Sequence, residues 1–313
     1  MLDLYTMQLL SWWGLFAAAL ALGFSLQNDS SDDDDPDGWP YASDPDFEDG
    51  SFGEIVVGGV GNDTLSASDD DVAAAIAGRT GDDLITGSRT SDYLRGGEGD
   101  DEIYGRVGID TIRGDAGDDY VDAGLGTDFV YGGPGDDTLD GNGNNDMLDG
   151  GDGDDLLLGG IGPDRLIGGA GNDTLSGLFE GRAAPNSENQ GSDDFDTLIG
   201  GEGDDELWLA YNDIAEGGAG SDHFIDDQRR YQDPDSEGAT ITDYDASEDQ
   251  ITLLFPNTTE DQPLPEITQA NSEDGADRLV FADGVQILRV AGAGGDEDLD
   301  LNVTTEEQMQ PQG

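Results

Sequence analysis

Residues 78–176 read GRTGDDLIT GSRTSDYLR GGEGDDEIY GRVGIDTIR GDAGDDYVD AGLGTDFVY GGPGDDTLD GNGNNDMLD GGDGDDLLL GGIGPDRLI GGAGNDTLS, which is 11 unbroken copies of a nine-residue unit. The sixth position of every copy is aspartate, and the eighth is aliphatic. Glycine fills the first position except at Ala123, and the fourth except at Thr90 and Asn144. So strict a period predicts an architecture in which neighbouring units stack on one another.

A single unit cannot fold alone, because it holds one aliphatic side chain and a glycine-rich loop that is entropically costly to order. If the residues around the eighth position form a short strand, the aliphatic side chain points to one face and its neighbours to the other. The preceding glycines allow the chain to turn. Two nine-residue units then complete one coil, and stacked coils would form parallel strands around a column of Ile, Leu and Val.

The fifth position separates the odd-numbered copies from the even-numbered ones. Odd copies carry Asp82, Asp100, Asp118, Asp136, Asp154 and Asn172 there. Even copies carry Ser91, Ile109, Thr127, Asn145 and Pro163. A bare nine-residue period would not produce this alternation. It predicts two stacks of loops on opposite edges of a flattened roll, of which one edge, the odd-loop edge, is the more acidic.

Acidic loops at this density repel one another and need a counterion. Calcium suits them, because it takes six to eight oxygen ligands from carboxylates and backbone carbonyls. Magnesium fits less well, since it requires near-octahedral geometry, and zinc is disfavoured in a chain with no cysteine and the single histidine His223. A disordered or merely solvated acidic tract is the alternative. Such a tract would not hold an aliphatic residue in phase through 11 copies.

The unit resembles the nonapeptide of the RTX calcium-binding family. The resemblance implies a parallel β-roll in which each ion lies between two loops of the same edge. It implies that the carbonyls at the second and fourth positions and the carboxylate at the sixth are ligands, with about nine Ca²⁺ ions in the continuous array. The aspartates so assigned are Asp63, Asp83, Asp92, Asp101, Asp110, Asp119, Asp128, Asp137, Asp146, Asp155, Asp164, Asp173, Asp196, Asp205 and Asp222. The fourth-position glycines so assigned are Gly81, Gly99, Gly108, Gly117, Gly126, Gly135, Gly153, Gly162 and Gly171.

The repeats extend beyond the continuous array. We expect an RTX β-roll over residues 58–225, with loop insertions near 67–77 and 177–190 and a degenerate turn around Asn212 and Asp213. The RTX resemblance then implies a C-terminal β cap over 226–305, and residues 306–313 read as a flexible tail. Strands are expected in the cap at 239–242, 250–255, 278–281 and 285–290, the last two joined by a hairpin-like turn. The predicted fold class is all-β, a parallel roll with an antiparallel cap.

Residues 1–27 are expected to form one hydrophobic helix before the roll. Leu9–Leu26 is an uncharged run that is just long enough to span a bilayer. A cleavable signal peptide competes, but it requires a basic n-region, and the only charge here is Asp3. A buried core helix is the third interpretation. We expect an uncleaved anchor, followed by an acidic linker rich in proline and aspartate over 28–57.

Composition narrows the function. The formal charge of −62 opposes binding to nucleic acid or to anionic lipid through charge. A single histidine excludes a His-Glu-x-x-His zinc protease, and no Gly-x-Ser-x-Gly motif occurs, so no catalytic residue is named and we expect a non-enzyme. The expectation is a secreted or cell-surface calcium-folded protein with a structural or adhesive role toward a surface glycan or protein. The alternative is a component of a secreted polysaccharide-acting enzyme.

Overall fold

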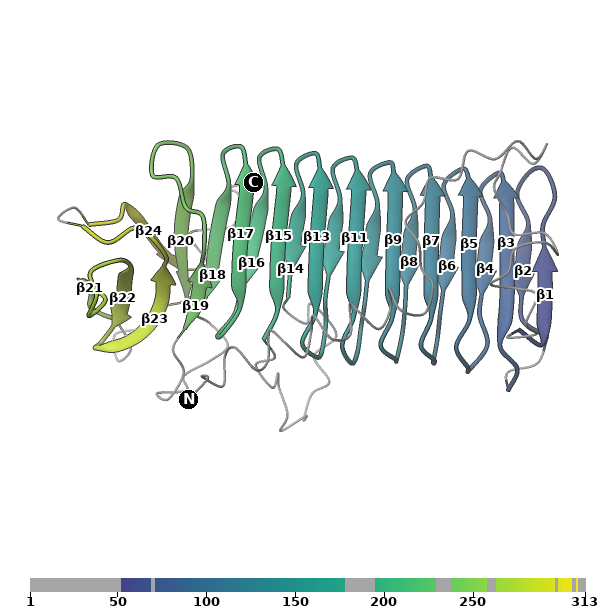
Figure 1. Ribbon diagram of the computed structural model, residues 1–313, viewed down its shortest axis with the longest axis horizontal. Helices are drawn as coiled ribbons and strands as arrows, with labels where there is room; N and C mark the ends of the chain where they lie inside the picture. Colours follow the sequence, from purple (N-terminus) through teal and green to yellow (C-terminus); the bar gives the residue numbers. More distant parts are fainter. Residues whose placement is uncertain are drawn as a thin grey trace. The chain divides into compact units, whose positions relative to one another are not determined.

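The computed structural model describes residues 52–68, 71–177, 195–228, 238–257, 263–295, 298–305 and 308. Every element in these residues is a β-strand, and the strands form one sheet of 13 (sheet A) and one of 11 (sheet B). From β1 to β20 the chain passes alternately from one sheet to the other, so that successive coils stack side by side (Figure 1). The predicted all-β parallel roll is confirmed.

The spatial order of the strands follows their order along the chain over most of each sheet. Sheet A runs β1 (Glu54–Val57), β3 (Ala74–Thr80), β5 (Tyr93–Glu98), β7 (Thr111–Ala116), β9 (Phe129–Pro134), β11 (Met147–Asp152), β13 (Arg165–Ala170), β15 (Thr197–Glu202), β17 (Ile214–Ala219), β19 (Ala239–Ile241), β23 (Val285–Val290), β22 (Arg278–Ala282) and β21 (Ile267–Asn271). Sheet B runs β2 (Thr64–Ser66), β4 (Leu84–Thr86), β6 (Glu102–Tyr104), β8 (Tyr120–Asp122), β10 (Thr138–Asp140), β12 (Leu156–Leu158), β14 (Thr174–Ser176), β16 (Glu206–Leu209), β18 (His223–Asp227), β20 (Gln250–Phe255) and β24 (Leu301–Thr305).

The core is the column of eighth-position side chains. Leu139 pairs in parallel with Val121 on one side and with Leu157 on the other, and each partner lies two repeats away along the chain. All three are fully buried, and so are the other aliphatic residues of the continuous array. The flanking seventh- and ninth-position residues are half-exposed, as the alternation of a strand requires. The register therefore shows that two repeats make one coil.

The roll begins earlier than the sequence predicts. Residues 54–57, assigned to the linker, form β1, which pairs with β3. Most of the insertion expected at 67–77 is also wrong, because residues 74–77 belong to β3. Ile76 takes the eighth position, opposite Leu94, and Ala74 stands where the other copies have aspartate. The interruption is therefore a degenerate repeat. Its coil is slightly longer than the regular ones, because Leu65 pairs with Ile85, 20 residues later, whereas Leu139 pairs with Leu157, 18 residues later.

The second interruption leaves the stacking intact. Arg165 of β13 pairs with Thr197 of β15, and Leu175 of β14 pairs with Leu207 of β16. The hydrogen bond from the Asp164 N–H to Asp196 Oδ1 crosses the same gap and spans 32 residues, against 18 residues from Asp146 to Asp164. The chain between β14 and β15 is thus much longer than a regular coil needs. Most of the loop predicted at 177–190 lies outside the described residues.

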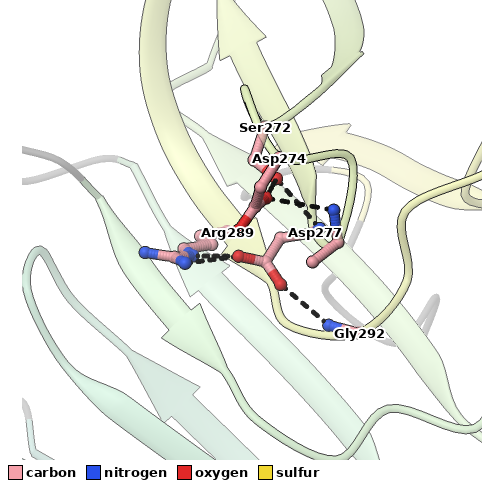
Figure 2. A network of polar contacts seen from close by, with 6 residues as sticks. Ser272, Asp274, Asp277, Arg289 and Gly292 are labelled. Carbon is pink, nitrogen blue, oxygen red and sulfur yellow. Dashed lines mark hydrogen bonds and ion pairs between the residues drawn. The ribbon is translucent and has the colours of Figure 1, made fainter.

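The C-terminal strands extend both sheets and then reverse direction. β19 and β20 continue the parallel stacking, and β23 and β24 join them in parallel. Antiparallel pairing is confined to β21 with β22 and β22 with β23 among the strands described. At this turn the Asp277 carboxylate accepts hydrogen bonds from Arg289 and from the Gly292 backbone N–H, and Ser272 bonds to Asp274 (Figure 2). These contacts fasten the ends of β22 and β23.

Within the described ranges, no helix is long and apolar enough to cross a membrane. The predicted N-terminal helix at 1–27 and nearly all of the tail at 306–313 lie outside those ranges, so the structure does not test them.

Replacing one core residue should weaken the whole stack. Leu139→Ala removes a fully buried side chain, and we expect a loss of about 2–5 kcal/mol in the free energy of unfolding in calcium. The half-exposed neighbour provides the control, because Thr138→Ala should cost less than about 1 kcal/mol. Guanidinium titrations followed by far-UV circular dichroism measure both. Equal losses in the two variants would contradict the assigned core.

Candidate metal sites at the loop edges

The sixth-position aspartates tie each coil to the next. The backbone N–H of Asp119 donates to Oδ1 of Asp137 at 2.8 Å, and the N–H of Asp137 donates to Oδ1 of Asp155 at 2.8 Å. The even-loop edge repeats the pattern, with Asp128 N–H on Asp146 Oδ1 at 2.8 Å. Each edge of the roll therefore carries a row of aspartates joined by hydrogen bonds along the stack.

The second carboxylate oxygen in these rows has no hydrogen-bond partner and is buried. In the described residues this holds for Oδ2 of Asp83, Asp101, Asp110, Asp119, Asp128, Asp137, Asp146, Asp155, Asp173 and Asp205. Within the same part of the chain, no arginine or histidine lies within ion-pair distance of any of them. A buried carboxylate oxygen without a partner is costly. The rows thus supply oxygen atoms that a cation would neutralise.

Burial shifts the ionisation of these carboxylates strongly. Desolvation raises the pKa of Asp119 to about 8 and that of Asp146 to about 9, and neighbouring aspartates add to the rise. The pKa of Asp101 and of Asp155 rises to about 7 for the same first reason. Backbone N–H donors oppose the shift without cancelling it. In the metal-free roll the ionised form of these groups is therefore disfavoured near neutral pH.

First-position glycines leave room for the orphaned oxygen. A methyl group on Gly141 would come within 2.7 Å of Asp146 Oδ2, and one on Gly132 would lie closer still to Asp137 Oδ2. The odd-loop edge is the tighter of the two throughout the array. This difference fits the sequence, since the one alanine at the first position, Ala123, lies on the even-loop edge.

Backbone carbonyls complete the set of oxygens. Gly117 and Gly135, at the fourth position, have φ angles of 130° and 146°, a conformation that side chains rarely adopt. The Gly117 carbonyl points along the stack at Gly135, where a Cβ atom would collide with it. Among the described residues, no hydrogen bond reaches the carbonyl oxygens of Gly99, Gly117, Gly135 or Gly153. These oxygens are available to a cation.

The odd-loop edge carries a second, exposed row of carboxylates at the fifth position. The N–H of Asp118 donates to Asp100 Oδ1 at 3.0 Å, and the N–H of Asp136 donates to Asp118 Oδ1 at 3.0 Å. In this exposed row each N–H donates to the aspartate 18 residues earlier in the chain, whereas in the buried row it donates to the aspartate 18 residues later. The even-loop edge has no carboxylate at the fifth position in the continuous array, so it carries no such row.

Two of the assigned aspartates lie in loops that are already closed by hydrogen bonds. Asp92 accepts the backbone N–H of Ser88 at 2.5 Å and its hydroxyl at 2.9 Å, in the copy whose fourth position is Thr90. Asp63, in the first complete loop, accepts the N–H of Gly59 at 2.6 Å. Both carboxylates belong to the rows, yet they are less suited to a metal than those of the regular copies.

The structure adds aspartates that the sequence prediction omits. Asp213 is fully buried and accepts the N–H of Asp196 at 3.1 Å, so it occupies the sixth position of the degenerate turn. Asp249 continues the other row, because it accepts the N–H of Asp222 at 3.0 Å. Each of these aspartates lies two residues before a core residue: Asp213 before Ala215, and Asp249 before Ile251. The copy that holds Asp213 is one residue short, and this shift of phase hides the site from a nine-residue motif.

A cluster of metal-binding side chains is not the basis of these sites. Within the described part of the chain, no group of three or more His, Cys, Asp or Glu side chains could hold an ion. Each site would combine one or two carboxylates with backbone carbonyls. Such all-oxygen sets suit calcium, which accepts irregular geometry, better than magnesium or zinc. The orphaned oxygens and the carbonyls of the regular copies therefore fit calcium.

A parallel β-roll with stacked aspartate loops defines a class of calcium-binding repeat proteins. The model of the RTX calcium-binding nonapeptide repeat matches this chain at residues 49–71, 77–112, 95–130, 104–139, 124–157, 149–179, 190–210 and 209–226. Together the matches cover more than half of the chain, so the protein belongs to this family. Its repeats are calcium-binding RTX repeats.

Solved structures give weaker likenesses. The AlgE6R3 subunit of the Azotobacter vinelandii mannuronan C5-epimerase is 23% identical, with a TM-score of 0.25, over 48% of this chain and 72% of that one. The extracellular lipase LipA of Serratia marcescens is 18% identical, with a TM-score of 0.21, over 74% of this chain and 39% of that one. Both TM-scores are low, so neither likeness carries functional weight. A comparison with curated proteins gives no match.

Acidification should fold the calcium-free roll. Burial raises the pKa of Asp137 from 3.8 to about 6 and that of Asp146 from 3.8 to about 9, so between the unfolded and the folded pKa values the folded state binds more protons than the unfolded state. The contribution to stability is fully present below pH 3.8 and is lost as the pH rises through the folded pKa values. We expect far-UV circular dichroism in calcium-free buffer to gain strand signal between pH 8 and pH 4.

Calcium should reverse this dependence, because the ion binds the ionised carboxylates. With saturating calcium, strand signal should be present at pH 7 and calcium affinity should fall on acidification. A calcium-free strand signal that is equal at pH 4 and pH 8 would contradict the proton linkage.

Adding a methyl group beside the orphaned oxygen should affect calcium-dependent folding more on the odd-loop edge than on the even-loop edge. Gly132→Ala places Cβ against Asp137 Oδ2 on the tight edge, and we expect a higher calcium concentration at the folding midpoint. Gly141→Ala, on the looser edge, should raise it less. Calcium titrations followed by circular dichroism compare the two. The site geometry is wrong if Gly141→Ala shows the larger effect.

Proposed function

We propose that this protein is a non-enzymatic, extracytoplasmic RTX protein that folds when it meets calcium outside the cell and then acts as a structural or adhesive component of the cell surface. The single observation that carries the proposal is the pair of rows of buried carboxylate oxygens without partners in the described residues. Neutralising them requires a cation that those residues do not provide.

The proposed mechanism couples folding to ion binding. In low cytoplasmic calcium, repulsion among the ionised aspartates and the cost of burying them oppose the roll. Where calcium is at millimolar concentration, an ion between successive loops removes both costs, and its binding free energy becomes folding free energy. With one ion between each pair of loops on the same edge, this mechanism predicts about nine ions in the continuous array.

The surroundings of the single histidine support a non-enzymatic role. His223 Nε2 lies 2.8 Å from Thr252 Oγ1, and His223 Nδ1 lies 3.8 Å from Glu206 Oε2. This order of groups resembles a hydroxyl nucleophile with its base and acid. Thr252 is only 1% exposed, so a substrate has no route to its hydroxyl. We therefore interpret the contacts among Glu206, His223 and Thr252 as structural, since they link β16, β18 and β20.

Removing the charge of one sixth-position aspartate should lower the number of bound calcium ions by one. Asp137→Asn keeps the Oδ1 acceptor of the aspartate row and removes the charge, so we expect an apparent calcium affinity lower by roughly tenfold or more and a lower ion count by elemental analysis. Asp136→Asn provides the matched control at the adjacent exposed position, where Asn also keeps the acceptor used by Asp154. It should leave the ion count unchanged. A wild-type protein that is fully folded in chelator would refute the proposal.

Glycan assays distinguish the alternative. The purified, calcium-loaded protein is incubated with uronate polymers and cell-surface glycans, and chain length and uronate composition are measured. We expect both to stay unchanged. Turnover of any polymer would replace the proposal with a polysaccharide-acting enzyme.

A further inference from the structure

One loop on the even-loop edge differs from the next in how its aspartate is bonded. Loop 87–92 reads GSRTSD, with a serine at its second position. Both carboxylate oxygens of Asp92 accept hydrogen bonds, Oδ2 from the Ser88 backbone N–H at 2.5 Å, and Oδ1 from the Ser88 hydroxyl at 2.9 Å and the Ala74 N–H at 2.7 Å. In the next even loop, Oδ2 of Asp110 is buried and has no hydrogen-bond partner among the described residues.

Hydroxyl groups fill the interior of loop 87–92. Ser88 has no exposed surface. Its Oγ donates to Asp92 and accepts the Thr90 backbone N–H at 3.1 Å, and Thr90 Oγ1 lies 3.0 Å from the same oxygen, within hydrogen-bond distance. Short hydroxyl side chains of this kind satisfy nearby backbone groups locally. A calcium ion could therefore bind the Asp92 carboxylate only by displacing hydrogen bonds that already satisfy it.

A guanidinium group joins this loop to the next one on the same edge. Arg106, in the next even loop, donates from Nη1 to the Gly87 carbonyl oxygen at 3.3 Å. The φ angle of Arg106 is 82°, in the left-handed region that favours glycine, and later even loops have Gly124 and Gly160 at the same position. The chain thus carries a fixed positive charge between two loops that regular stacking would join through an ion. That charge opposes a divalent cation beside it.

The other side of loop 87–92 lacks the aspartate of a regular loop. Ala74 stands where the preceding even loop would carry its sixth-position aspartate, and the N–H of Ala74 bonds to Asp92. The aspartate row of this edge therefore starts with a carboxylate whose two oxygens are both bonded. Among the described residues of the even-loop edge, the orphaned oxygens begin only at Asp110.

We propose that loop 87–92 takes no calcium, because its own serine and threonine hydroxyls and the guanidinium of Arg106 hold it closed in place of an ion. This assignment rests on the proposed function, in which calcium lies between the regular loops. It adds a rule for which copies are metal sites: the copy must carry the sixth-position aspartate, and the protein must leave Oδ2 of that aspartate without a partner. The even-loop edge then holds one ion fewer than uniform stacking would give.

Ion counts of aspartate variants test the closed loop. Bound calcium per chain is measured by elemental analysis at saturating calcium, after circular dichroism has shown that each protein is folded. Asp92→Asn should leave the ion count unchanged. Asp128→Asn is the matched control in a loop of the same edge with an orphaned Oδ2, and Asn keeps the acceptor that the Asp110 N–H uses. It should bind one ion fewer than wild type.

Opening the loop should create a site. The triple variant Ser88→Gly, Thr90→Gly and Arg106→Gly gives both loops the glycines of a regular copy and removes the guanidinium, so it should bind one ion more than wild type. Asn144→Gly is the control, because it also removes a side chain from the fourth position of an even loop. In that loop Asp146 Oδ2 already has no hydrogen-bond partner among the described residues, so the count should stay unchanged.

Two results would overturn the proposal, namely the loss of an ion in Asp92→Asn and the absence of a gained ion in the folded triple variant. If only one of these two variants folds in calcium, that variant alone decides. Unchanged counts in both Asp92→Asn and Asp128→Asn would refute the proposed function, and the closed loop with it, because calcium binding would then not depend on the aspartate rows.

Discussion

The hydrogen bond from the N–H of one sixth-position aspartate to Oδ1 of the next, 18 residues along the chain, is the contact on which the rest of the roll depends. It sets the distance between coils and turns the carboxylates inward, where the second oxygen of residues such as Asp119, Asp137 and Asp155 has no hydrogen-bond partner among the described residues. The apolar column alone could stack the strands. It could not remove the cost of the buried charge, so the same contact that orders the loops creates the requirement for a cation.

The two loop edges meet this requirement differently. On the odd-loop edge, the first-position glycines lie closest to the carboxylate oxygen, and a second row of aspartates runs outside the first. The even-loop edge is looser and tolerates Ala123, Asn144 and the hydrogen-bonded loop of Asp92. The strict edge therefore has the more uniform sites, and the other edge can lose single sites to side-chain hydrogen bonds while its strands remain in register.

Much of this architecture could be predicted, because one residue type at one phase fixes both the core and the ligand rows. The predictions are wrong where a copy keeps its core residue and loses its aspartate. Ala74 replaces the aspartate two residues before Ile76, so a motif search reads an insertion where β3 lies. Asp213 escapes such a search for the opposite reason, since it keeps the carboxylate in a shortened copy whose core position is only Ala215. The direction of the C-terminal strands depends on long-range pairing, which local patterns do not encode.

The unbroken register between β13 and β15 has a consequence for how such a molecule can change. The strands on either side of the long connection between β14 and β15 pair without any shift of register, because every coil is held by its neighbours and not by the length of the connection. Foreign segments could be grafted at this position, or at equivalent turns, with little penalty. A scaffold of this kind can acquire new recognition loops during evolution while its framework stays fixed.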